Sequence, residues 1–143
     1  MLRYTVMILL AACAANQGVK DYYDEVERGS TWLLGLGQPT RDSGIADDCP
    51  IFAAKTATIP SGAVTGSEVG CTATLAFTIE DDGDVTSDWN SFADFEQKCN
   101  DGSQLSCNDG PVAPSLSMIC TLVNMQSALA GDCHYMATLV RVD

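Results

Sequence analysis

The chain has 143 residues, of which 19 are acidic and seven are basic, so its formal net charge is −12. This length suffices for one domain with a modest hydrophobic core. A surface with this much negative charge repels the phosphate backbone of nucleic acids. We therefore expect no nucleic acid among the partners of this chain.

The N-terminal residues 1–12 have the order of a secretory signal peptide. Arg3 supplies a basic start, residues 6–10 are apolar, and small residues follow them. The stretch Leu10-Ala11-Ala12-Cys13 resembles the lipobox of bacterial lipoproteins, in which the cysteine becomes the lipidated first residue of the mature chain. The resemblance implies a lipid on Cys13 and attachment to a membrane by acyl chains, because the apolar run is too short for a transmembrane helix.

After this signal, we expect residues 13–19 to form a short tether and residues 20–143 to form one globular domain. Cleavage after Ala15 with ordinary secretion is the alternative. Both alternatives export the chain, either to a bacterial outer membrane or periplasm as a lipoprotein, or to the outside as a secreted protein.

Six cysteines remain after either cleavage, an even number that suits three disulfide bonds in an exported protein. The sequence does not determine which of them pair. Two Cys-Asn-Asp-Gly units, at 99–102 and 107–110, predict two tight turns, and a Cys99–Cys107 bridge would close the loop between them. The disulfide candidates are Cys49, Cys71, Cys99, Cys107, Cys120 and Cys133.

The first part of the domain predicts one helix and one strand. Residues 21–28 have acids at their start and Arg28 at their end, an arrangement that suits the dipole of a short helix. Residues 31–37 are apolar but interrupted by glycine, which predicts a buried turn or a short strand. Residues 38–48 are polar and predict a loop, whereas residues 52–59 mix Ala, Thr and Ile and favour a β-strand.

The clearest strand prediction covers residues 71–79, where apolar and threonine side chains alternate. This period of two indicates a strand with one buried face and one nearly solvent-exposed face. Residues 81–83 then predict a hairpin turn, and residues 84–89 predict the returning strand. The side chains expected on the buried face are Cys71, Ala73, Leu75, Phe77 and Ile79.

The second half of the domain predicts two helices and a final strand. Residues 91–99 begin with Ser91 as a helix cap and carry apolar side chains at helical spacing. Residues 115–129 are broadly apolar and predict a buried helix, and residues 134–142 predict a β-strand. Together these elements predict the α+β class: a small antiparallel sheet with one or two helices, stabilised by disulfide bonds.

No motif in the chain supplies a catalytic set. Asp132-Cys133-His134 contains an acid, a thiol and a base, but adjacent residues on a strand point to opposite faces, so we expect Cys133 in a disulfide bond beside an exposed histidine. A single histidine and the lack of Cys-x-x-Cys pairs argue against zinc. The sequence therefore favours a non-enzymatic protein, while it leaves enzymatic activity open.

Calcium is the one cofactor for which the sequence offers ligands. The spacing of the acids does not follow the EF-hand pattern, and the same residues suit ordinary turns. We therefore expect no cofactor, with calcium as the alternative. The candidate calcium ligands are Asp81, Asp82, Asp84, Asp101 and Asp109.

Residues 60–85 resemble the start of a TonB C-terminal domain, in which a proline and small residues precede an acid-glycine step, a strand and an Asp-Gly hairpin. The family's helix ends in an aromatic-basic-aromatic stretch that has no counterpart after Gln126, and the cysteine-bearing segment 94–113 is foreign to the family. The resemblance implies a βαβ-type envelope domain that contacts other proteins by adding a strand at a sheet edge. The matching places are Pro60, Ala63, Glu68, Gly70, residues 77–79, Asp82, Gly83 and Val85.

These observations predict a non-enzymatic envelope protein, tethered at Cys13, that binds another envelope component or supports structure. The expected partners are a membrane, through the lipid anchor, and an envelope protein. The nine acids from residue 80 to residue 109 are typical of a solvated face, and a basic protein partner or a divalent cation is the alternative. The alternatives are a secreted hydrolase or protease inhibitor with its site in residues 80–109, and a calcium-dependent binding module.

Overall fold

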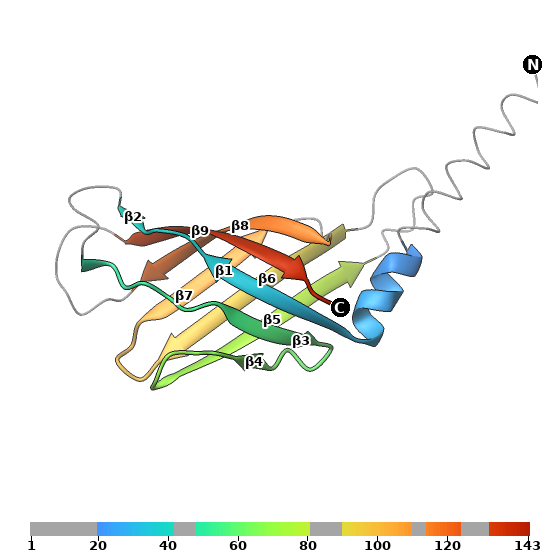
Figure 1. The fold of residues 1–143 in the computed structure, drawn as a ribbon, viewed down its shortest axis with the longest axis horizontal. Coiled ribbons are helices and arrows are strands. Elements are labelled where there is room, and N and C mark those ends of the chain that lie inside the picture. The colour runs from blue at the N-terminus through green and yellow to red at the C-terminus, as the bar shows by residue number, and fades with distance from the viewer. Residues whose placement is uncertain (1–19, 42–47, 81–89, 110–113, 124–131) are drawn as a thin grey trace, which may run out of the picture.

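The domain is an antiparallel sheet that curls into a nearly closed barrel, with one short helix at its end (Figure 1). The computed structural model describes residues 20–41, 48–80, 90–109, 114–123 and 132–143. The α+β prediction is therefore wrong, because within these residues nearly all regular structure is strand. The domain belongs to the antiparallel β class, and disulfide bonds stabilise it as expected.

The nine strands in the described part of the chain form a single sheet, in which neighbours in sequence are mostly neighbours in space. Strands β5 to β9 run as a continuous meander, and β1 pairs with both β9 and β3. The short β2 pairs with β9 outside this path. The strands are β1 Ser30–Leu36, β2 Thr40–Arg41, β3 Lys55–Ile59, β4 Val64–Thr65, β5 Cys71–Glu80, β6 Asn90–Cys99, β7 Gln104–Asp109, β8 Ser115–Val123 and β9 Cys133–Arg141.

The barrel closes where the end of the β3–β4 hairpin meets β5. Ala63 and Thr74 form an isolated antiparallel bridge, and the backbone N–H of Leu75 donates a hydrogen bond to the Gly62 carbonyl at 3.1 Å. Gly62 has a φ of +74°, and a Cβ atom at this position would lie 2.8 Å from the Leu75 carbonyl oxygen. Closure therefore needs glycine at position 62, for its backbone conformation and for the close approach of β5.

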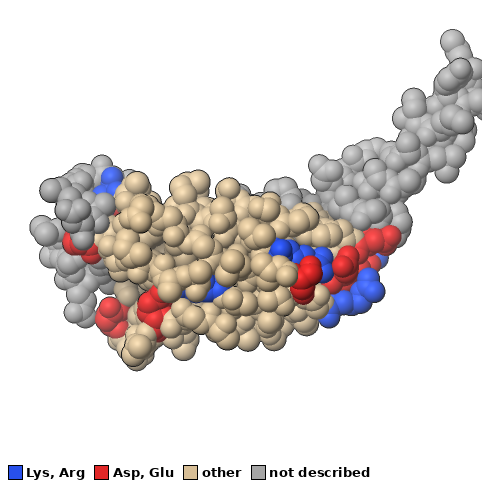
Figure 2. All heavy atoms as spheres, viewed as in Figure 1, with Lys and Arg blue, Asp and Glu red and all other residues tan. Residues whose placement is uncertain are grey.

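The core fills the inside of the barrel with side chains from alternate positions of the strands. Trp32 is fully buried, packs edge-on against Phe77 with ring centroids 4.8 Å apart, and donates its indole N–H to the Ser30 hydroxyl. On the outside, few charged side chains cover the middle of the wall that Figure 2 displays, and most gather towards the two ends. Other fully buried side chains include Leu75, Leu105, Met118, Tyr135 and Leu139.

The helix of residues 20–28 confirms the prediction for 21–28 and lies at the end of the barrel where β1 begins and β9 ends (Figure 1). Its Tyr23 and Val26 side chains are buried in the core. Glu25 forms a 3.1 Å ion pair with Arg141 at the end of β9. These contacts hold the helix against this end of the barrel.

Two predicted helices are strands. Residues 91–99 lie in β6, where burial alternates at every residue: Phe95 is 2% exposed, whereas Phe92 is 50% exposed. Residues 115–123 lie in β8, which buries Met118 and exposes Ile119, while residues 124–129 lie outside the described part. Apolar side chains at a spacing of three or four residues predicted helices. In the structure, β6 and β8 each pair with strands on both sides, and this pairing satisfies the hydrogen bonds of their backbone N–H and C=O groups.

The remaining element predictions fall mainly on strands. The strands expected at 71–79 and 134–142 are confirmed as β5 and β9, and the one expected at 52–59 is confirmed over 55–59 as β3. Of residues 31–37, residues 31–36 lie in β1, which confirms the short strand rather than the buried turn. The loop expected at 38–48 contains β2, and the turn and strand predicted for 81–89 lie outside the described residues.

The segment that resembles a TonB domain contains β4 and all of β5. Strand β5 pairs directly with the antiparallel strand β6, so the βαβ arrangement implied by the resemblance is not the fold observed in the described residues.

Three disulfide bonds pair the six candidate cysteines as Cys49–Cys133, Cys71–Cys99 and Cys107–Cys120. The last two bonds join residues directly opposite one another on neighbouring strands, with Cα atoms 4.0 Å apart in each pair. The Cys99–Cys107 prediction is wrong because the register of β6 and β7 places Phe95, not Cys99, opposite Cys107. Of the two expected turns, 99–102 is confirmed, whereas residues 107–109 belong to β7.

Replacing Cys49 and Cys133 by alanine should lower the free energy of unfolding by about 1–2 kcal/mol more than replacing Cys107 and Cys120. The first bond spans 84 residues and the second spans 13, so the first restricts the unfolded chain more, even though the other bonds shorten its effective loop. All four cysteines are buried, so the cavities left behind are similar. Urea unfolding of the two double variants measures the difference, and equal losses would contradict the expectation.

Candidate functional site

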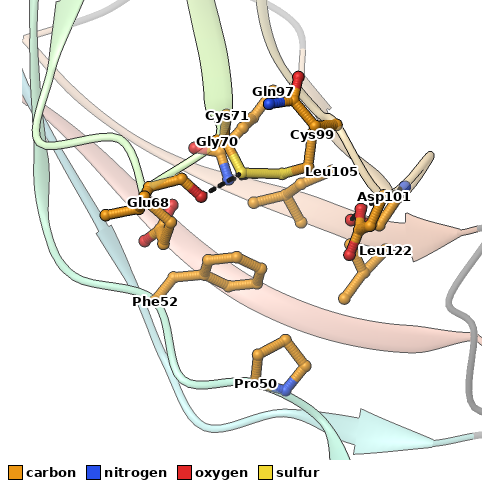
Figure 3. Close-up of a pocket in the computed structure, with 13 residues that line it drawn as sticks. Pro50, Phe52, Glu68, Gly70, Cys71, Gln97, Cys99, Asp101, Leu105 and Leu122 are labelled. Carbon is orange, nitrogen blue, oxygen red and sulfur yellow. Dashed lines mark hydrogen bonds between the residues drawn. A yellow bond between two sulfur atoms is a disulfide. The ribbon is translucent and has the colours of Figure 1, made fainter.

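A pocket of about 480 Å³ lies at the end of the barrel opposite the helix. It sits where β5 and β7 begin and where β6 and β8 end, whereas the helix adjoins the start of β1 and the end of β9. We call it the mouth pocket (Figure 3). It is lined by Pro50, Phe52, Glu68, Val69, Gly70, Cys71, Gln97, Cys99, Asn100, Asp101, Ser103, Leu105 and Leu122.

One wall of the mouth pocket is the segment that carries Pro50 and Phe52. The Cys49–Cys133 bond ties this segment to β9. The buried Tyr135 hydroxyl donates a 2.7 Å hydrogen bond to the Pro50 carbonyl, and the Tyr135 and Phe52 rings pack edge to face at 5.2 Å. Burial raises the pKa of Tyr135 to about 12, so this donor keeps its proton throughout the neutral range.

The opposite wall consists of the Cys71–Cys99 disulfide bond and the adjoining turn (Figure 3). The backbone N–H of Asn100 donates a 2.8 Å hydrogen bond to the Gly70 carbonyl, and Gly70 has a φ of +78°. The chain can therefore turn sharply into β5 beside the disulfide bond. One wall is thus bonded to β9 by a disulfide bond, and the other contains a disulfide bond that joins β5 to β6; hydrogen bonds support both walls.

A buried ion pair supports the side of the pocket between these walls. The Lys55 ammonium group, 1% exposed, lies 2.7 Å from Glu68 Oε1 and donates a second hydrogen bond to the Ala53 carbonyl at 3.0 Å. It also lies 5.4 Å from the centre of the Phe52 ring. The pair therefore links β3, the Pro50–Phe52 wall and the chain just before β5.

The charged side chains that line the mouth pocket are acidic. Burial is the largest single influence on the pKa of Glu68 and raises it, but hydrogen bonds from Lys55, Gln97 and the backbone, together with the charge of Lys55, lower the pKa below its ordinary value. Hydrogen bonds from the Ser103 hydroxyl and backbone N–H lower the pKa of Asp101. Both carboxylates are therefore charged at neutral pH, and no lining residue in the described part of the chain is basic.

Two lining residues also carry buried oxygen atoms without hydrogen bonds. By distance and angle, Glu68 Oε2 and Gln97 Oε1 accept none from the described part of the chain, although the Gln97 side chain lies close enough to Glu68 to help lower the pKa of that carboxyl. Buried acceptors are usually satisfied, so these two atoms are places where a ligand with N–H or O–H groups gains binding energy.

The structure separates the calcium candidates that it describes. Asp101 lies in the β6–β7 turn, whereas Asp109 ends β7 at the far end of that strand. Asp81, Asp82 and Asp84 lie outside the described residues. Among the residues that are described, no group of three or more acidic, histidine or cysteine side chains is placed to hold a metal ion.

The remaining site predictions concern Cys13 and Cys133. Cys13 and the signal-like segment lie outside the described residues, and no helix inside them is long and apolar enough to cross a bilayer. Cys133 is fully buried in its bond to Cys49, whereas His134 contacts the Thr121 hydroxyl at 3.3 Å. The prediction of a disulfide bond at Cys133 is confirmed, but the histidine beside it is half-buried rather than exposed as predicted.

Sequence reasoning did not single out the mouth pocket, yet one residue carried a signal. Lys55 alternates with Ala57 and Ile59, so it falls on the same buried face of β3. A lysine on such a face requires an acidic partner. That partner, Glu68, lies 13 residues further along the chain and is brought close by the β3–β4 hairpin.

No known protein family matches this chain, and no characterised protein or solved structure is significantly similar to it. The functional argument therefore depends on the geometry and chemistry of the mouth pocket.

Replacing Glu68 by glutamine should lower the free energy of unfolding by about 1–3 kcal/mol at neutral pH, because Lys55 stays buried without its counter-charge. The pKa of Glu68 in the folded protein lies below its ordinary value of 4.5. Its contribution is thus fully present above about pH 4.5 and is lost as the pH falls through the folded-state pKa. The difference between the wild type and the variant should therefore shrink in acid, which chemical denaturation at several pH values measures.

Glu96→Gln is the matched control, because Glu96 pairs at 3.3 Å with Lys98, whose side chain is 65% exposed. An exposed pair of this kind contributes less than about 1 kcal/mol. Equal losses for the two variants, or a Glu68 effect that grows in acid, would contradict the role given to the buried pair.

Proposed function

We propose that this protein is an exported, non-enzymatic binding protein that holds its ligand in the mouth pocket. The observation that carries the proposal is that a disulfide bond fixes each of two facing walls of the pocket: Cys49–Cys133 bonds one wall to β9, and Cys71–Cys99 joins β5 to β6 within the other. Small-molecule sites are typically preformed cavities of a few hundred Å³, with mostly apolar linings and a few placed polar groups. The mouth pocket combines these properties.

The disulfide bonds and the N-terminal sequence together support export of the protein from the cytoplasm. Three disulfide bonds point to an oxidising environment. With the lipobox-like stretch before Cys13, they support a mature chain that begins at Cys13 and is held at a bacterial outer membrane or in the periplasm by a lipid. Secretion after cleavage at Ala15 is the alternative.

An envelope component is the partner that this location favours. The net charge of −12 and the acidic mouth pocket support a basic partner. Nothing in the described residues favours the hydrolase, the protease inhibitor or the calcium-dependent module over this proposal.

Intact mass measurement of the protein recovered from its native host tests export and tethering. We expect a chain that begins at Cys13 and carries acyl mass, and alkylation after denaturation should label six further thiols only when reductant is present. A mass that begins at Asn16 without lipid would select secretion. A full-length chain with free thiols would contradict export.

Fragment screening by two-dimensional NMR tests binding at the mouth pocket. Ligands should shift the signals of Phe52, Leu105 and Leu122, and Val69→Trp should weaken their binding by about tenfold, which corresponds to about 1.4 kcal/mol. The Val69 side chain is fully exposed at the rim of the pocket, so this change leaves the core intact.

Val142→Trp is the matched control, because Val142 is an exposed valine at the opposite end of the barrel. Fragments whose binding responds to Val142→Trp rather than to Val69→Trp would contradict the proposal, as would the absence of any shift around the mouth pocket.

A further inference from the structure

The three disulfide bonds of the described residues differ in how far solvent reaches them. Cys71 and Cys99 are both half-buried, and their bond lines the mouth pocket (Figure 3). Thiol–disulfide exchange requires an attacking sulfur to reach the bond, and exposed disulfide bonds are the labile ones. A dissolved thiol therefore reaches Cys71–Cys99 before the other two bonds. The four cysteines of those bonds are at most 6% exposed: Cys49, Cys107, Cys120 and Cys133.

The two sulfur atoms of the Cys71–Cys99 bond have different polar neighbours. The fully buried Gln97 amide donates an N–H to Cys99 Sγ, with 3.9 Å between the nitrogen and the sulfur. Cys71 Sγ instead lies 4.0 Å from the Val69 carbonyl oxygen. An N–H donor stabilises a thiolate, whereas a carbonyl oxygen accepts a hydrogen bond only from a protonated thiol. When the bond breaks, the negative charge is therefore more stable on Cys99 than on Cys71.

The Glu68 carboxylate beside this wall does not cancel the difference. Its charge is paired with the Lys55 ammonium group at 2.7 Å. The Gln97 amide has two N–H bonds, so it serves Cys99 Sγ as well as the carboxylate whose pKa it lowers.

The barrel does not need the Cys71–Cys99 bond in order to keep its fold. Strands β5 and β6 pair over ten positions, and Cys71 and Cys99 are the pair at one end of this ladder. Next to them, the Asn100 N–H donates a 2.8 Å hydrogen bond to the Gly70 carbonyl. Breaking the bond leaves the ladder, this hydrogen bond and the two buried disulfide bonds in place. The two sulfur atoms therefore stay close enough for the bond to form again.

We infer that the Cys71–Cys99 bond is a site of reversible thiol–disulfide exchange with a dithiol. The exchange goes beyond the proposed binding function and does not depend on it. It is stoichiometric, so it agrees with a non-enzymatic protein. Its consequence for the mouth pocket is that one wall has two covalent states.

The exchange consists of two displacement steps. In the first, a thiolate of the dithiol attacks Cys71 Sγ and forms a mixed disulfide, while the bond to Cys99 breaks and its electron pair stays on Cys99 Sγ, beside the Gln97 N–H. In the second, the other thiolate of the dithiol attacks the partner sulfur of the mixed disulfide and releases Cys71. Both released thiolates take protons from water. The protein bond is thus reduced to two thiols, and the dithiol is oxidised to a disulfide.

Timed alkylation of the oxidised full-length chain tests whether this bond exchanges selectively. The protein is incubated with dithiothreitol in native buffer, free thiols are blocked with N-ethylmaleimide at intervals, and peptide masses assign the label to each cysteine, with Cys13 counted apart. We expect Cys71 and Cys99 to be labelled at least about tenfold faster than the four buried cysteines. Amide NMR spectra should show a folded barrel throughout, and oxidised dithiothreitol should close the bond again. Equal rates for all three bonds, or labelling only on unfolding, would overturn the inference.

A neutral monothiol identifies the sulfur that is attacked. After brief treatment with 2-mercaptoethanol and N-ethylmaleimide, we expect the mixed disulfide on Cys71 and the alkyl group on Cys99 to exceed the reverse arrangement by about tenfold. Equal amounts, or an excess of the reverse arrangement, would contradict the assigned first step. This measurement needs no variant.

Gln97→Met removes the N–H donor without adding a charge. It should slow the reaction with dithiothreitol by about tenfold and bring the two mixed disulfides close to equal amounts, because Cys99 loses its advantage as the leaving group. Gln104→Met is the matched control, because the Gln104 amide donates to Glu96 at 2.6 Å rather than to a sulfur atom. A folded Gln97→Met variant that keeps the wild-type rate and the preference for Cys71 would contradict the role of Gln97.

Two sources supply a dithiol: a small molecule and a pair of cysteines on a protein. Dithiothreitol and a blocked tetrapeptide with a cysteine at each end, compared at equal thiolate concentration, distinguish them. Faster exchange with the peptide indicates a protein partner, and faster exchange with dithiothreitol indicates a small dithiol. If neither reduces Cys71–Cys99 in the folded protein, the inference fails and the mouth pocket remains a binding site.

Discussion

The antiparallel register of β5 to β8 is the constraint on which the rest of the structure depends. It places Cys71 opposite Cys99 and Cys107 opposite Cys120, so that both covalent bonds form between directly paired residues. It also sets Leu105 opposite Leu122 in the mouth pocket. A shift by one residue would turn every one of these side chains to the outer face, which the disulfide bonds prevent once they have formed.

The buried Lys55–Glu68 pair has a different role from that of the disulfide bonds. Removing two charges from water costs several kcal/mol, and their attraction recovers this cost only with good geometry and further hydrogen bonds. Lys55 has both, through its 2.7 Å contact with Glu68 and its hydrogen bond to Ala53. The net stabilisation by such a pair is small compared with the loss when one partner is removed. Its main effect is to hold a charged carboxylate at the side of the mouth pocket.

Several parts of the fold could be predicted from the sequence because they depend on local pattern. Strand β5 alternates threonine with apolar residues, and the helix of residues 20–28 has acids at its start and Arg28 at its end. The helices predicted where the structure has β6 and β8 are wrong for a physical reason. In the sequence from Ser91 to Cys99, the spacing of the apolar residues fits both the two-residue period of a strand and the 3.6-residue period of a helix. Pairing partners from distant parts of the chain decide between the two periods, and a local pattern does not contain them.

The sequence by itself determined the acidic charge, the even number of candidate cysteines, the export-like start and the strands with strict alternation, because each depends on composition or on neighbouring residues. Only the tertiary structure decided which cysteines pair, since two pairings follow from strand register across separations of 28 and 13 residues, and the third joins β9 to a segment 84 residues away in the sequence. It likewise decided that Lys55 meets Glu68 and that Phe52, Gln97, Leu105 and Leu122 line one cavity. These residues come from five segments of the chain, and they meet only because the sheet curls and closes through the contact of Gly62 with β5.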